Sequence, residues 1–207
     1  MNIPSRFGNA LVDLLDQTKR VDFLGPLALR IYLAPIFIMA GWNKLSALED
    51  TSYYFGEFLG LPAPMTMAVL AGLVEFIGGI ALVLGLGLRL LVIPLMFTMV
   101  VAAATAHWEN GWHALPEATL TVPWEWRTDL IEGAQERKDV IRALLREHGN
   151  YSWLTATGSI TILKNGIEFA ATYFVMLLML LFSGPGRYIS LDYWFARKYR
   201  PGQTRAG

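Results

Sequence analysis

Residues 64–90, PMTMAVLAGLVEFIGGIALVLGLGLRL, decide the fold class of this chain. The first basic residue of this segment is Arg89, and Glu75 is its one acidic residue. The hydrocarbon core of a bilayer is about 30 Å thick and is crossed by about 20 helical residues. The segment therefore predicts a membrane-spanning helix with a carboxyl group near its middle.

A carboxyl group inside a bilayer is costly and usually faces the interior of a helix bundle. Spacings of four, three and four residues place one set of side chains on a single helical face: Ala68, Gly72, Glu75 and Gly79. Small residues on such a face let a neighbouring helix approach closely. We therefore expect Glu75 to contact a partner helix and not lipid.

The composition of the whole chain agrees with a small polytopic membrane protein of one domain, residues 1–207. The chain has 54% apolar residues and a mean hydropathy of +0.40. Its formal net charge is zero, which gives no indication of nucleic-acid binding. The absence of cysteine excludes disulfides, thiol catalysis and cysteine-ligated iron–sulfur clusters within this chain. Residues 1–22 contain no uninterrupted apolar core, so we expect no cleaved targeting segment.

Further apolar segments predict an all-α fold, an integral membrane four-helix bundle. The predicted spans cover about residues 24–44, 64–87, 90–107 and 160–183. Residues 108–150 form an extramembrane insertion, in which apolar residues at helical spacing predict an amphipathic helix over about 127–147. The sequence Lys-Asn-Gly at 164–166 interrupts the last predicted span, and Asn-Gly is typical of a turn. We therefore expect the last helix to be broken near the membrane surface.

The distribution of basic residues predicts how the bundle is oriented. Four spans place both termini on one side, and most of the lysines and arginines in the short flanks lie on that side. In the insertion, five basic residues are outnumbered by eight acidic residues. Because Lys and Arg are enriched in cytoplasmic flanks, we expect a bacterial inner-membrane protein with cytoplasmic termini. Residues 108–150 then face the periplasm.

Charged and polar side chains near the outer ends of the spans predict a pocket that opens outward. The residues assigned to catalysis are Glu75, Arg30 and His107, and those assigned to a substrate or quinone pocket are Lys44, Lys164, Asn165, Glu168 and Trp108. Arg30 and Glu75 lie at comparable depth, so Arg30 is the expected partner of Glu75, with Lys44 and Lys164 as the next choices. Lys164 and Glu168 are four residues apart and can pair across one helical turn. The alternative is that such pairs only fix the register of the helices.

Signals for a metal site are weak. His107 and His113 are six residues apart in a loop, and no pair of histidines suits a haem. Methionines in the spans offer thioethers to Cu(I), but methionine is also a common apolar residue there. We therefore predict no metal or copper site within this chain and treat a quinone as the candidate cofactor.

Three motifs, in chain order, resemble the DoxX family over about residues 24–194. The first motif is Arg30, Phe37, Gly41 and Lys44, the second is GLVEFIGG at 72–79 with LGL at 84–86, and the third is GPGRY at 184–188 with Ser190, Leu191 and Asp192. In addition, HWENGW at 107–112 and KNGIEF at 164–169 resemble the HvfX-type subgroup, which is associated with the maturation of copper-binding modified peptides. The resemblance implies a four-helix membrane bundle linked to quinone-dependent oxidation or to membrane redox complexes.

The sequence supports two main hypotheses of function and a third, less favoured one. In the first, the predicted pocket binds a quinone or another small redox molecule, with its polar side chains supplying hydrogen bonds and proton transfer. In the second, the chain is a non-enzymatic subunit or assembly factor that docks a periplasmic partner. The third is a small-molecule or metal transporter. The expected partners are the lipid bilayer and a periplasmic or membrane redox protein, and a homo-oligomer is left open.

Overall fold

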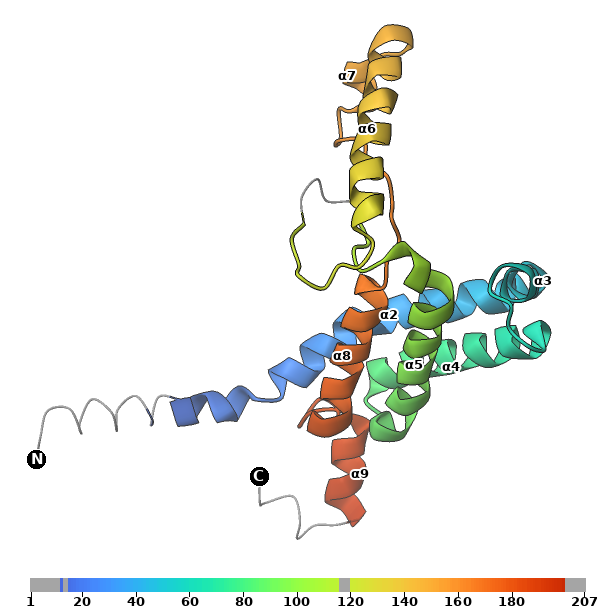
Figure 1. Cartoon of the computed structure of the whole chain (residues 1–207). Helices are drawn as coiled ribbons and strands as arrows, with labels where there is room; N and C mark the ends of the chain where they lie inside the picture. The colour runs from blue at the N-terminus through green and yellow to red at the C-terminus, as the bar shows by residue number, and fades with distance from the viewer. Residues whose placement is uncertain (1–11, 13–14, 116–119, 200–207) are drawn as a thin grey trace, which may run out of the picture. The chain divides into compact units, whose positions relative to one another are not determined.

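The computed structural model describes residues 12, 15–115 and 120–199, and the regular secondary structure of these residues is entirely helical (Figure 1). This confirms the all-helical fold class, whereas the four-span bundle stays a prediction. The chain divides into two compact units, residues 1–98 with 175–207 and residues 99–174. Each unit is described by itself.

The helical elements follow one another along the chain with short connections in the first unit and a longer one before α6. In order they are η1 (Lys19–Val21), α2 (Leu24–Ser46), α3 (Leu48–Tyr53), η2 (Tyr54–Phe58), α4 (Pro64–Leu84), α5 (Leu88–Ala102), η3 (Ala103–His107), η4 (Trp108–Asn110), α6 (Thr128–His148), α7 (Tyr151–Leu154), α8 (Glu168–Ser183) and α9 (Leu191–Tyr199).

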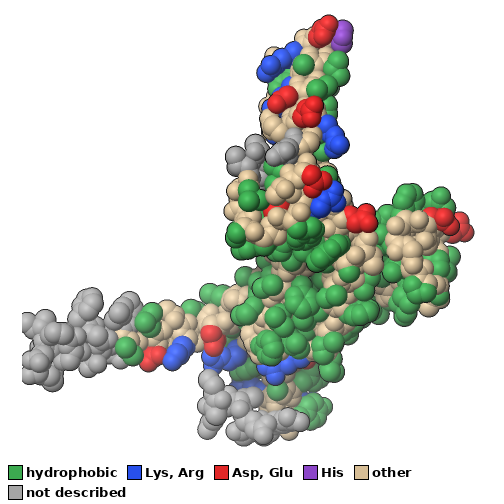
Figure 2. Space-filling model, in the orientation of Figure 1, with side chains coloured by type: hydrophobic (Ala, Val, Ile, Leu, Met, Phe, Trp, Pro, Cys, Tyr) green, Lys and Arg blue, Asp and Glu red, His purple; other side chains and the backbone are tan. Residues whose placement is uncertain are grey.

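Within the described residues, three helical stretches are long and apolar enough to cross a membrane. They are Leu24–Ser46, Pro64–Leu84 and Leu88–Asn110. The first three predicted spans are therefore confirmed as helices of suitable length and composition. Many of their apolar side chains point outward, and Figure 2 shows hydrophobic side chains over much of the visible surface of these helices. An apolar surface of this extent is stable against lipid and not against water.

The last predicted span, residues 160–183, differs from its prediction in length. The helix α8 begins only at Glu168 and has 16 residues. Asn165 adopts a positive φ of 60°, and residues 159–166 are not helical. The turn expected at Asn165-Gly166 therefore precedes the helix and does not interrupt it, and the apolar helix that follows is shorter than the three candidate spans.

The closest packing in the first unit is between α2 and α4, which lie side by side in Figure 1. Glycines form the contact: a Cβ at Gly41 would lie 2.4 Å from the backbone N of Phe76, and one at Gly79 would lie 2.7 Å from the backbone N of Ile38. The predicted face of α4 is buried at Ala68, Gly72, Glu75 and Gly79. The small residues thus permit the close approach that the sequence predicts.

In the second unit, α6 is an amphipathic helix whose ends agree with the prediction within one residue. The helix covers Thr128–His148, and Gly149 is its C-cap. Ile131 and Ala134 in its first half are buried, whereas most of its side chains are exposed. Figure 2 shows charged side chains along this helix. Its polar character contrasts with the apolar helices of the first unit.

Candidate functional site

An ion pair joins α2 to α4. Lys44 Nζ lies 2.6 Å from Glu75 Oε2. The side chain of Glu75 is 5% exposed, and that of Lys44 is 26% exposed. Glu75 therefore contacts a basic side chain on a partner helix, as predicted. That partner is Lys44, so the first-choice pairing with Arg30 is wrong.

A missing side chain on α4 makes room for this pair. Gly72 lies one turn before Glu75, and a Cβ at Gly72 would lie 2.8 Å from Cγ of Leu45 and 3.4 Å from Cβ of Lys44. Because position 72 has no side chain, α2 comes close enough for the lysine to reach the carboxylate. The glycine face of α4 is thus part of the geometry of the ion pair.

The ion pair keeps unused hydrogen-bonding capacity. Among the residues that the structure describes, Glu75 Oε1 accepts no hydrogen bond, and Lys44 Nζ donates to Glu75 alone. An ammonium group has three donors and a carboxylate has about four acceptor sites. The intact pair therefore retains both donor and acceptor sites.

Arg30 has a different environment, in which its donors are already used. Its Nε donates to the carbonyl of Leu82 at 2.7 Å, and its Nη2 donates to that of Val83 at 2.8 Å. Its Nη1 donates to the carbonyls of Pro185 and Ile189, both at 2.8 Å. Arg30 is 2% exposed. The guanidinium thus satisfies carbonyls at the end of α4, which lack intrahelical partners, and joins them to the turn after α8.

Asp192, which follows the turn after α8, attaches this segment to the connection between α4 and α5. The sequence analysis did not place Asp192 in a site. Its Oδ1 accepts from the N–H of Gly87 at 2.7 Å, and its Oδ2 accepts from the N–H of Leu88 at 3.1 Å. Its own N–H donates to the carbonyl of Gly85 at 3.0 Å. A carboxylate at the start of α5 caps free N–H groups and complements the helix dipole. The signal in the sequence was the third motif of the resemblance, which ends at Asp192.

The second unit contains an ion pair that is more deeply buried. Lys164 Nζ lies 2.8 Å from Glu125 Oε2, and their side chains are 4% and 0% exposed. Lys164 Nζ also donates to the carbonyl of Arg127 at 3.3 Å. The predicted pairing of Lys164 with Glu168 is wrong because the chain before Glu168 is not helical, so the helical spacing of four residues does not apply.

Glu125 was missed by the sequence analysis, although it organises this part of the second unit. Its carboxylate accepts hydrogen bonds from the backbone N–H groups of Trp112 and His113 at 3.1 Å and of Arg127 at 2.9 Å. The local signal is the sequence Trp-Glu-Trp at 124–126, in which one acidic residue lies between two large apolar ones. An acidic residue in such a context is buried only if it has partners.

Backbone hydrogen bonds join the two motifs of the subgroup resemblance. Gly166 N donates to the carbonyl of His113 at 3.0 Å, and Glu168 N donates to that of Trp112 at 2.9 Å. Oε2 of Glu168 accepts from the N–H of Ala114 at 2.9 Å. A Cβ at Gly166 would lie 2.5 Å from the carbonyl of His113, so the segments come this close only with glycine at that position. Five predicted residues are therefore brought together in this unit: His107, Trp108, Lys164, Asn165 and Glu168.

His107 ends the π-helical element η3, a kind of turn that often occurs at functional sites. Its Nδ1 lies 2.8 Å from the carbonyl oxygen of Asn165. Because a carbonyl only accepts, Nδ1 donates this hydrogen bond, and in the neutral ring Nε2 then carries the lone pair. Nε2 has no hydrogen-bond partner in the described part of the chain. The ring of Trp108 lies 4.8 Å from that of Trp126, centroid to centroid.

The predicted site residues therefore fall into two units and two chemical states. Arg30 and Lys164 are buried with their donors engaged. The Lys44–Glu75 pair in one unit and the Nε2 of His107 in the other retain free capacity. These groups are the candidate functional groups, and their convergence in one pocket stays a prediction. Within residues 15–115 and 120–199, no group of three or more His, Cys, Asp or Glu side chains could hold a metal ion.

The buried Glu125–Lys164 pair predicts an acid-sensitive second unit. Burial would raise the pKa of the Glu125 carboxyl, but the hydrogen bond from Lys164 and three backbone donors lower it from 4.5 to about 2. A carboxyl group whose pKa is lower in the folded state stabilises the fold at pH values above its pKa in the unfolded state. This stabilisation is lost as the pH falls to its pKa in the folded state. We therefore expect a loss on the order of 3 kcal/mol between about pH 4.5 and pH 2. Tryptophan fluorescence and thermal melting against pH measure it.

The control for this experiment is Glu125→Gln. The variant should be less stable than the wild type at pH 7, because its neutral amide gives Lys164 no charged partner. It should also lack the part of the pH dependence between about pH 4.5 and pH 2 that Glu125 contributes. Coincident pH profiles of the two proteins would contradict the role assigned to Glu125.

The fold and the ion pair define a class of helical protein whose apolar helices are of membrane-spanning length and carry a charged pair between them. Residues 25–108 match the DoxX family model. This range contains the three candidate spans almost completely, together with Arg30, Lys44, Glu75 and His107. It does not include α6, α8 or the turn that Arg30 and Asp192 fix.

Two curated relatives are similar to part of the chain. "Inner membrane protein YqjF" of Escherichia coli (strain K12) is 37% identical over 67 residues, which are 32% of this chain and 49% of the relative. "Putative oxidoreductase CatD" of Bacillus subtilis (strain 168) is 33% identical over 82 residues, which are 40% of this chain and 59% of the relative. The chain thus spans about half the length of the curated relatives that it matches. No solved structure matches the chain.

Proposed function

We propose that this chain is a DoxX-type inner-membrane protein that binds a quinone, or a similar small redox carrier, at the Lys44–Glu75 pair. The observation that carries the proposal is the unused hydrogen-bonding capacity of this pair between two helices of spanning length. Ionisable groups inside membrane helices commonly mark substrate or proton pathways. The similarity to a relative named as an oxidoreductase supports a redox role.

The chemistry of the pair suits a carrier that has carbonyl oxygens. Lys44 donates a hydrogen bond to one carbonyl oxygen, and Glu75 exchanges a proton with the reduced form. The electrons come from a separate membrane or periplasmic redox protein. In this proposal the chain holds and protonates the carrier, and it acts as one component of a cell-envelope oxidoreductase or of a copper-peptide maturation system.

The proposal includes a topology with four spans. The helix α8 has 16 residues, which is about 24 Å, and a short span of this kind is accommodated by local thinning of the bilayer. Both termini are then cytoplasmic, and residues 108–150 face the periplasm. His107 belongs to the outer end of its span, where its Nε2, which has no partner among the described residues, suits proton exchange with the periplasm.

Quinone binding to variants of the pair tests the proposal. In nanodiscs, Glu75→Gln and Lys44→Met should each weaken the binding of a soluble ubiquinone or menaquinone analogue by about tenfold, because each removes a charge-assisted hydrogen bond. Isothermal titration calorimetry measures the Kd. The matched control is Lys138→Met on α6, which should leave the Kd unchanged.

A double variant separates the functional role from a structural one. Lys44→Met combined with Glu75→Leu removes both charges and leaves no stranded partner. If the pair serves the carrier, the double variant melts near the wild-type temperature but binds the quinone analogue weakly. A stable double variant with wild-type affinity would show that the pair only fixes the register of the two helices, and would reject the proposal.

A second candidate function, docking of a periplasmic partner, rests on an apolar surface in the second unit. Large apolar side chains on the second half of α6 and on α7 are exposed: Val140, Ile141, Leu144, Trp153 and Leu154. Val140 and Leu144 are one turn apart on the same helical face. Val140→Asp with Leu144→Asp should remove a co-purifying partner without changing quinone affinity, if this surface is a docking site.

A further inference from the structure

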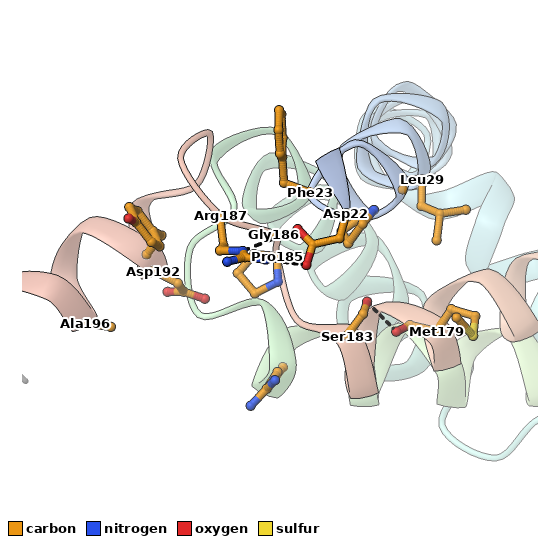
Figure 3. Close-up of a pocket in the computed structure, with 14 residues that line it drawn as sticks. Asp22, Phe23, Leu29, Met179, Ser183, Pro185, Gly186, Arg187, Asp192 and Ala196 are labelled. Carbon is orange, nitrogen blue, oxygen red and sulfur yellow. Dashed lines mark hydrogen bonds and ion pairs between the residues drawn. The ribbon is translucent and has the colours of Figure 1, made fainter. Parts of the chain in front are cut away.

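A pocket in the first unit is separate from the Lys44–Glu75 pair. Its volume is about 1020 Å³, and it is open on one side. Figure 3 shows its walls, which come from the approach to α2, the end of α8, the turn that follows and α9. Arg89 of α5 also lines it. The pocket thus lies where two candidate spans begin and an apolar helix ends.

The acidic residues of this pocket are neutralised within the chain. Arg187 Nη2 lies 2.5 Å from Asp22 Oδ2, and Figure 3 shows these side chains facing each other. Asp192 accepts hydrogen bonds from the N–H groups at the start of α5. The pocket therefore presents no acidic group without a partner.

Arg89 is a basic side chain of this pocket that has no acidic partner among the described residues. It is exposed, and the structure gives it one hydrogen bond, from Nη2 to the carbonyl of Phe182 at 3.3 Å. A guanidinium has five N–H donors arranged as a fork that matches a carboxylate or a phosphate. Gly186, which also lines the pocket, has a backbone N–H that donates to no acceptor among the described residues. Both groups suit an anion.

Part of the wall of this pocket is apolar. Phe23, Pro26, Leu29 and Met179 line it, and none of their side chains offers a hydrogen bond. An inorganic anion would leave this wall in contact with water. A ligand with an anionic head and a hydrocarbon tail would use the arginine and the apolar wall together.

The surroundings of the pocket have the composition of a membrane surface. Exposed aromatic residues follow α8 at Tyr188, Trp194, Phe195 and Tyr199. Basic residues also lie close in sequence to the residues that line the pocket: Lys19, Arg20, Arg197 and Lys198. Aromatic rings are enriched at the level of lipid headgroups, and basic pockets at the ends of spans attract anionic headgroups.

We propose that this pocket binds an anionic phospholipid, with the headgroup phosphate on Arg89 and an acyl chain along Phe23, Leu29 and Met179. Such a lipid would hold the beginnings of α2 and α5 and the end of α8 together from outside, at the level of the headgroups. The inference does not depend on the quinone proposal, since the two use different residues.

Lipid titration followed by native mass spectrometry tests the inference. The detergent-solubilised protein is titrated separately with phosphatidylglycerol, phosphatidylcholine and inorganic phosphate. We expect phosphatidylglycerol to bind with at least about tenfold lower Kd than phosphatidylcholine, and inorganic phosphate to displace it poorly. Arg89→Gln should raise the Kd for phosphatidylglycerol about tenfold, since it removes the charged donor.

Two further variants make the test decisive. Ala196→Trp places a large ring at the mouth of the pocket from an exposed position of α9, so it should reduce lipid binding without removing a charge. Arg137→Gln on α6 removes one arginine elsewhere and should leave the Kd unchanged. Equal binding of both lipids, wild-type affinity in both pocket variants, or displacement by phosphate at equal concentration would overturn the inference.

Discussion

Arg30→Met is expected to lower the stability of the first unit more than any other single substitution proposed for this chain. The substitution leaves the carbonyls of Leu82, Val83, Pro185 and Ile189 without their donor. Each buried polar group that loses its partner costs about 1–3 kcal/mol. A loss of more than about 4 kcal/mol is therefore expected, which is exceptional for one substitution. Thermal melting in detergent measures it.

The position of the damage can also be measured. Limited proteolysis should cut Arg30→Met within residues 187–199 much faster than the wild type, because the turn before α9 loses its attachment to α4. Arg30→Lys should be intermediate, since an ammonium group has fewer donors and no planar fork. The matched control is Arg137→Met on α6, an exposed arginine. An unchanged melting temperature in Arg30→Met would contradict the structural role of this residue.

Gly41→Ala is expected to lower the stability of the first unit as well, through the packing of α2 against α4. The added Cβ would lie 2.4 Å from the N of Phe76 and 2.7 Å from the carbonyl oxygen of Gly72, and both are backbone atoms that cannot rotate away. The helices must move apart, at a cost of about 1–3 kcal/mol for overpacking. This exceeds the gain of about 1 kcal/mol in helix propensity.

The same substitution should weaken the ion pair, because Lys44 lies one turn after Gly41. We expect a lower melting temperature together with weaker quinone binding. The matched control is Gly25→Ala in the same helix, where a Cβ meets nothing within 4 Å. Gly25→Ala should therefore be neutral or slightly stabilising. If both alanine variants melt at the same temperature, the close packing of the helices has no energetic role.

The arrangement of α2 and α4 was predictable from sequence up to its register. The small residues at helical spacing on α4 fix the face that is buried, and Glu75 on that face needs a basic partner. The choice of Arg30 failed because equal depth was counted from the helix ends. The helix α4 begins beyond the end of α2, where α3 packs against it, so Glu75 lies opposite Lys44. Helix ends are a poor reference when a loop such as residues 47–63 has helical structure of its own.

The second unit was less predictable because its contacts are irregular. The ion pair of Glu125 and Lys164 joins residues 39 positions apart, without a helical or strand period between them. Local spacing favoured Glu168 as the partner of Lys164 and was misleading because the backbone before Glu168 is not helical. The two motifs at 107–112 and 164–169 were recognisable, but the fact that they pair through their backbones follows only from the structure.

The hydrogen bonds of Arg30 can form only at different stages of the synthesis of this chain. Arg30 enters early, and its first acceptors, Leu82 and Val83, follow 52 and 53 residues later. Pro185 is 155 residues away from Arg30. At 5–20 residues per second, the ribosome needs roughly 8–30 s to reach it. During that interval Arg30 lacks two of the four carbonyl acceptors that it has in the complete structure. The turn after α8 therefore completes the hydrogen bonds of Arg30 only when most of the chain has been synthesised. A chain that stops before this turn would leave the Nη1 of Arg30 without its two acceptors.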